Sequence, residues 1–150
     1  MLSVDPTRVG ERSAPVSTEV EKGAIRRLAE ALGETNPIYF EESAARQAGY
    51  RHVVAPPTFP MTLAPASVPG LRLPAAGVLH GEQRFVYGEP ICAGDVIAVR
   101  AWLEDVKARK GQRGTMTVLG VASEGVNQWG QMVFQAHATL IVTEVTEGAG

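Results

Sequence analysis

The stretch that decides the fold is residues 30–62, EALGETNPIYFEESAARQAGYRHVVAPPTFPMT. It contains a helix end, a polar turn, a short second helix and the proline-opened start of a third. Five residues interrupt regular structure along it: Gly33, Pro37, Gly49, Pro56 and Pro57. Loops held between regular elements are where binding and catalytic residues concentrate. We therefore expect a functional site in this stretch.

Three helices are predicted in and around this stretch. The first covers residues 19–32, because apolar residues recur there at helical intervals and Thr18 and Glu21 have capping-box spacing. The second covers residues 41–48. The third covers residues 57–67, which are apolar nearly all round, as is typical of a buried helix.

After residue 76 the apolar pattern changes from a helical period to a period of two. Residues 78–87, 97–104 and 116–121 predict strands, and the clearest alternation runs from Met132 to Val142. The predicted fold class is α+β: a curved antiparallel sheet wrapped around one long central helix, residues 57–67. Such a sheet has open edges, so we expect a dimer.

Length and composition limit the possible classes of protein. A chain of 150 residues with 45% hydrophobic content is long enough for one domain, residues 1–150. Fourteen Lys and Arg against 16 Asp and Glu favour neither a nucleic-acid nor a membrane partner. The single cysteine, Cys92, the absence of a signal-peptide pattern and the lack of a membrane-length apolar run predict a cytoplasmic protein. No metal-ligand spacing or dinucleotide glycine pattern is present, so we expect neither a metal nor a cofactor.

Several motifs resemble one known family. Residues 33–39, Gly-Glu-Thr-Asn-Pro-Ile-Tyr, resemble the hydratase motif Gly-Asp-x-Asn-Pro-x-His of MaoC-like, hot-dog-fold proteins. Residues 54–59 and 79–85 are similar to the N-terminal-type dehydratase domains related to type I fatty acid synthase, including the substrate-binding subunits of mycobacterial-type (3R)-hydroxyacyl-ACP dehydratases. Residues 90–95 resemble the family's Pro-x-x-x-Gly-Asp turn. The likeness covers about residues 8–143, which we expect to form the core of the domain.

The resemblance implies a reaction and a set of site residues. Such proteins reversibly dehydrate 3-hydroxyacyl to trans-2-enoyl thioesters carried on CoA or ACP. The catalytic aspartate and histidine of the motif correspond to Glu34 and Tyr39, a degenerate dyad. The N–H that polarises the thioester carbonyl falls at about Pro56 or Pro57, and proline has no N–H. The substrate-binding residues that the resemblance implies are Asn36, Ala55, Pro57, Thr58, Phe59 and His80.

A degenerate site of this kind implies a division of labour. The chain would bind the acyl-CoA or acyl-ACP, either as a homodimer or as a heterodimer in which a catalytic MaoC-like subunit supplies the aspartate and histidine. Two other functions stay open: a non-catalytic acyl-thioester binding module, and a hot-dog thioesterase in which Glu34 positions water.

Each candidate residue also has a plain structural explanation. Glu34 could be a polar helix-end residue, Tyr39 a packed aromatic and His80 a hydrogen-bonded strand residue. Cys92 reads as a small apolar filler. The one basic cluster is more simply a solvated turn than a phosphate site; it comprises Lys107, Arg109, Lys110 and Arg113.

Overall fold

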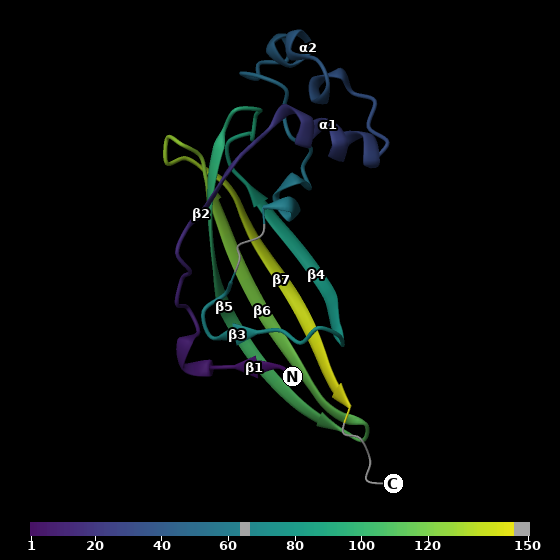
Figure 1. Ribbon diagram of the computed structural model, residues 1–150, viewed down its shortest axis with the longest axis vertical. Coiled ribbons are helices and arrows are strands. Elements are labelled where there is room, and N and C mark those ends of the chain that lie inside the picture. Colours follow the sequence, from purple (N-terminus) through teal and green to yellow (C-terminus); the bar gives the residue numbers. More distant parts are fainter. Residues whose placement is uncertain (64–66, 146–150) are drawn as a thin grey trace.

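A long antiparallel sheet makes up the larger part of the computed structural model, which describes residues 1–63 and 67–145. Its five strands lie in the order β2-β5-β6-β7-β4 (Figure 1), and each neighbouring pair is antiparallel. The strands are β2 (Val16–Glu19), β4 (Val78–Tyr87), β5 (Val96–Gly111), β6 (Gly114–Val126) and β7 (Met132–Val145).

Alternation of side chains gives the sheet two different faces. On β7, Phe134, Ala136 and Val142 are buried on the face that we call the inner face. Gln135 and His137 lie on the opposite, outer face and are only half-buried. Because successive side chains of a strand point to opposite faces, this pattern confirms the predicted alternation over residues 134–142. At the start of the strand the prediction is wrong, because Met132 is exposed and Val133 is buried.

Short elements lie at the two ends of the sheet. Helices α1 (Lys22–Ala31) and α2 (Glu42–Gln47) lie beyond one end, and the two-stranded sheet of β1 (Ser3–Val4) and β3 (Leu71–Arg72) crosses near the other (Figure 1). Three 3-10 helices complete the described elements: η1 (Pro6–Arg8), η2 (Pro37–Tyr39) and η3 (Phe59–Thr62).

The prediction of a long central helix over residues 57–67 is wrong. The structure has only η3 there, followed by Leu63 as its C-cap; residues 64–66 lie outside the described residues. The hydrogen bonds of this segment, such as Met61 N–H to Thr58 O at 3.0 Å, all span three residues rather than four. The prolines explain this, because Pro57 and Pro60 have no N–H to give to an α-helical ladder. Met61 is 49% exposed, so the segment is not buried all round either.

The predicted start of the first helix is also wrong. Thr18 does not cap a helix but lies in β2, where it pairs with Ile97 of β5. The helix begins three residues later than predicted, and its N-cap residue, Glu21, makes no side-chain cap hydrogen bond. Strand pairing has therefore taken Thr18, the first residue of the suggested capping box, and the short strand β2 was not predicted.

Two apolar clusters cover the inner face. The first packs α1 and η3 against the sheet near α1, through Ile25, Phe59 and Phe134. The second packs β1 and β3 against the other part of the sheet, around Leu103 and Leu119. Between the two clusters the inner face carries small side chains, and this is where the central groove described below lies.

Candidate functional site

The turn that resembles a hydratase motif lies beside the entry to η3. The Asn36 side-chain oxygen accepts a hydrogen bond from Ile38 N–H at 3.2 Å and caps η2, so this residue, predicted to bind substrate, braces the turn. Ile38 O accepts from Val54 N–H at 3.1 Å, which fixes the turn against the segment that leads into η3. The turn and the start of η3 are therefore one local unit.

The two predicted catalytic residues share this turn. Glu34 is exposed at its start, and Tyr39 is half-buried at the end of η2. Burial, together with the nearby Glu34 carboxylate, raises the pKa of Tyr39 above its ordinary value of about 10. Tyr39 therefore keeps its proton at neutral pH and can donate a hydrogen bond, but it cannot replace a group that exchanges protons near pH 7.

An entrance cavity of about 260 Å³ opens next to the start of η3. Ala55, Pro57 and Pro60 line one side, and Tyr50, Tyr87 and Glu89 are among the residues that line the rest. The Tyr87 hydroxyl donates to Pro57 O at 2.6 Å, and burial raises the pKa of Tyr87. Two of the predicted substrate-binding residues, Ala55 and Pro57, thus lie in this cavity, whereas Thr58 is exposed beside it.

The central groove, about 200 Å³ in volume, runs over the inner face beyond the entrance cavity. Its floor consists chiefly of three small side chains, Ala101 of β5 and Ala136 and Ala138 of β7. Pro60 lines both cavities. Gln83 and Ser123 add polar atoms to an otherwise apolar lining.

The remaining predicted contacts fall outside the entrance cavity. Phe59 is 3% exposed and belongs to the first apolar cluster. His80 is exposed on the edge strand β4, where its Nε2 lies 2.9 Å from Gln83 Oε1. Because Gln83 lines the central groove, His80 lies beside the groove and not beside the turn.

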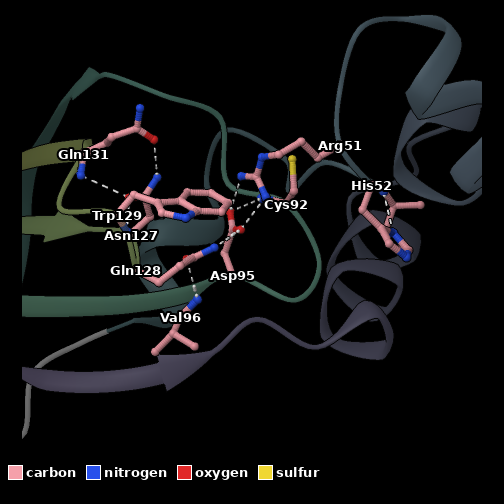
Figure 2. Close-up of polar contacts among 10 residues, drawn as sticks. Arg51, His52, Cys92, Asp95, Val96, Asn127, Gln128, Trp129 and Gln131 are labelled. Atoms are coloured by element: carbon pink, nitrogen blue, oxygen red, sulfur yellow. Dashed lines mark hydrogen bonds and ion pairs between the residues drawn. The ribbon is translucent and has the colours of Figure 1, made fainter.

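A polar cluster next to the entrance cavity was not predicted (Figure 2). Asp95 is fully buried, and its carboxylate accepts from Arg51 Nη1 at 2.8 Å and Nη2 at 3.0 Å. The same carboxylate accepts from Cys92 N–H at 2.9 Å and from Gln128 Nε2 at 3.1 Å. On its open side the Arg51 guanidinium lies over the Trp129 ring, 4.6 Å from the ring centre.

Opposing effects act on the Asp95 carboxyl. Burial raises its pKa, but the hydrogen bonds from Arg51, Cys92 N–H and Gln128 outweigh burial and hold the pKa below its ordinary value. Asp95 is therefore ionised at neutral pH. The motif at residues 90–95 pointed to this aspartate, but its partner Arg51 lies 44 residues earlier in the chain, and no local sequence signal links the two.

Beside this cluster is a polar cleft of about 240 Å³. Arg51, Glu89 and Gln131 contribute charged and polar atoms to it, and Gly49, Tyr50 and Cys92 also line it. Tyr50, Glu89 and Pro90 line both the polar cleft and the entrance cavity. The two cavities are therefore neighbours.

A cavity of about 690 Å³ lies elsewhere, at the tip of the β5–β6 hairpin among Arg109, Lys110 and Arg113. It lies at the opposite end of the sheet from α1 and α2 (Figure 1), so we do not assign it to the site. Within residues 1–63 and 67–145, no group of three or more His, Cys, Asp or Glu side chains could hold a metal ion. No helix in that part of the chain is both long and apolar enough to cross a membrane.

Comparison with known proteins gives consistent matches. A family model described as FAS1-like, dehydratase domain region, matches residues 7–136. A UPF0336 protein of Thermobifida fusca is 36% identical over 134 residues, 85% of this chain and 86% of that protein.

Two solved structures, both two-protein complexes from Mycobacterium tuberculosis, resemble the fold. The C-terminally truncated HadBC (3R-hydroxyacyl-ACP dehydratase) complex contains a chain 25% identical to this one, with a TM-score of 0.69 and 94% of both chains covered. The ChsH1-ChsH2 complex contains one that is 21% identical, with a TM-score of 0.73, covering 93% of this chain and 88% of the other. The predicted α+β hot-dog fold and the resemblance to MaoC-like dehydratases are confirmed.

Proposed function

Because the chain belongs to the family of FAS1-like dehydratase domain regions, we propose that it binds fatty acyl thioesters and takes part in the reversible dehydration of 3-hydroxyacyl to trans-2-enoyl thioesters. Its role is that of the substrate-binding subunit, working in the cytoplasm beside a catalytic MaoC-like subunit. The ligand is an acyl-CoA or an acyl-ACP.

The observation that carries this proposal is the central groove. Its floor of alanines and its walls of Leu63 and Phe85 offer apolar surface that is open next to the entrance cavity. Burying an alkyl chain there contributes about 0.8 kcal/mol for each methylene removed from water. The groove volume equals that of about seven water molecules, which suits a stretch of alkyl chain.

The chemistry of the turn supports the need for a partner. Dehydration requires groups that give and take protons near neutral pH. Tyr39 holds its proton too firmly for that, and Pro56 and Pro57 have no N–H to stabilise a developing oxyanion. A partner with an intact aspartate and histidine supplies these groups. The two solved structures described above are two-protein complexes, which is consistent with this assignment.

The test is a hydration assay. Purified protein, a MaoC-like subunit with an intact Gly-Asp-x-Asn-Pro-x-His motif, and their mixture are each given crotonyl-CoA and a long-chain enoyl-CoA. Loss of the enoyl absorbance and release of free thiol are followed together. We expect water addition to the long-chain substrate only, or far faster, in the mixture.

Other outcomes identify the rival functions. Hydration by the chain alone that is lost in Glu34→Gln would show a self-sufficient active site. Thiol release would indicate a thioesterase. Binding of the substrate without turnover under any of these conditions would indicate a non-catalytic module.

A further inference from the structure

Three neighbouring cavities lie in series, and the polar cleft at one end has a more polar lining than the other two. The polar cleft adjoins the entrance cavity at Tyr50, Glu89 and Pro90, and the entrance cavity adjoins the central groove at Pro60. We infer that the polar cleft around Arg51, Glu89 and Gln131 binds the pantetheine arm that CoA and ACP share. This inference rests on the proposed function, because it assigns the other end of the same ligand.

The order of the cavities fixes the direction of the ligand. An acyl thioester has an alkyl chain on one side of its carbonyl and the pantetheine arm on the other. With the alkyl chain in the central groove, the thioester lies in the entrance cavity by Pro57 and Tyr87. The arm then continues into the polar cleft.

The cleft offers hydrogen-bonding groups that match the two amides of the arm. Arg51 has five N–H donors, and Asp95 takes two of them; its side chain is 48% exposed. The others can reach amide carbonyl oxygens. The Glu89 carboxylate, which accepts no hydrogen bond from any side chain in the described part of the protein, can accept from amide N–H groups.

Charge balance favours a neutral ligand over a phosphate. The Arg51 charge is matched by the buried Asp95 carboxylate, and Glu89 adds a negative charge to the cleft. A diphosphate or nucleotide would meet no excess positive charge here. The pantetheine arm beyond its phosphate carries no charge, and amides suit such a lining.

The cleft is also held rigidly before any ligand arrives. Trp129 covers the Arg51 guanidinium and Gln128 braces Asp95, both from the loop that joins β6 to β7 (Figure 2). A donor that is already fixed loses little entropy when it forms a hydrogen bond to the ligand. Arg51 is therefore a binding residue, and Asp95 is a positioning residue that acts through it.

The experiment compares ligands with and without the arm by displacement of a fluorescent fatty acid. The probes are decyl methyl thioether, S-decylpantetheine, S-decyl-CoA and S-decyl-ACP, all resistant to hydrolysis. We expect the wild-type protein to bind S-decylpantetheine about tenfold more tightly than the methyl thioether, the gain of one or two good hydrogen bonds. S-decyl-CoA is expected to bind within about threefold of S-decylpantetheine.

Two variants test whether Arg51 and Glu89 bind the pantetheine arm. Glu89→Ala and Arg51→Lys should each lose most of the advantage of the arm, measured within each variant as the ratio of its affinities for S-decylpantetheine and the methyl thioether. Glu30→Ala, on the exposed surface of α1, is the matched control and should behave as wild type. Glu89→Ala keeps the test valid if Arg51→Lys fails to fold, because the Glu89 side chain makes no described hydrogen bond.

The results distinguish failure of the proposed pantetheine cleft from failure of the proposed acyl groove. Binding of the methyl thioether with no advantage for S-decylpantetheine overturns the pantetheine cleft and leaves the acyl groove standing. Absence of binding for every probe overturns both. If S-decyl-CoA bound tenfold or more tightly than S-decylpantetheine, the protein would recognise the nucleotide, which contradicts a site for the uncharged arm. If S-decyl-ACP alone were preferred, ACP would be the source of the arm.

Discussion

Asp95 is the single residue whose replacement we expect to cost the most stability. Asp95→Asn keeps the size of a buried side chain but removes the charge that binds Arg51 and orients Gln128. We expect the free energy of unfolding to fall by about 2–3 kcal/mol, since hydrogen bonds to a charged group are involved and half-exposed Arg51 can rehydrate. Urea denaturation measures this free energy.

The control is Glu42→Gln, which breaks the exposed pair with Arg46 and should lower the free energy of unfolding by under about 0.5 kcal/mol. Equal losses of stability in both variants would contradict the special role of Asp95.

The same carboxyl gives the protein a pH dependence. The pKa of Asp95 is lower in the folded protein than in the unfolded chain, where it is about 3.9. Its contribution to stability is therefore complete above that unfolded value and is lost as the pH falls through the folded value. Unfolding free energies measured from pH 7 to pH 2 should drop more steeply below about pH 4 in wild type than in Asp95→Asn. Parallel curves for the two proteins would show that Asp95 is not the group responsible.

The sequence placed candidate site residues together only where the signal was local. Glu34, Asn36 and Tyr39 lie within one turn, so a motif could place them together, and the structure does so. Arg51 and Trp129 could not be found in this way. Their contact depends on the hairpin between β6 and β7 folding back beside the loop after α2, which no spacing in the chain records.

At the scale of elements, the strand β7 carries the groove floor on one face and a polar surface on the other. Ala138→Leu fills the groove with three further carbon atoms, so we expect binding of a decyl ligand to weaken at least about tenfold while stability changes by under about 1.5 kcal/mol. Displacement titration and urea denaturation measure the two effects.

The neighbouring residue provides the control. Thr139 follows Ala138 on β7 and points to the outer face, so Thr139→Leu adds apolar volume without entering the groove. Its ligand affinity should equal that of wild type. If both variants weakened binding equally, the ligand would not occupy the groove.

The elements differed in how well sequence predicted them. The long strands were predictable because one buried face imposes a period of two over most of a strand, as in residues 134–142. The central helix was predicted wrongly, because the prediction gave more weight to the apolar composition of residues 57–67 than to their prolines. In the structure Pro57 and Pro60 limit the segment to one 3-10 turn.

At the scale of the whole molecule, β4 forms one edge of the described sheet. It runs for ten residues with Leu79, Val86 and Tyr87 exposed along it, which makes it the expected contact for a second subunit. Val86→Lys should lower the association constant measured by analytical ultracentrifugation, because a charge would be buried in the contact. Val9→Lys, at another exposed valine, should leave association unchanged. A normal association constant in Val86→Lys would place the contact elsewhere.

We propose that the inner face of the sheet holds an acyl chain, at the place where a long helix over residues 57–67 was predicted. The most direct test of this proposal is a crystal structure of the protein with S-decylpantetheine. We expect the alkyl chain to lie on the inner face against Ala101, Ala136 and Ala138, with η3 still one turn long. An α-helix lying over these residues, or a ligand bound elsewhere with the groove empty, would contradict the account.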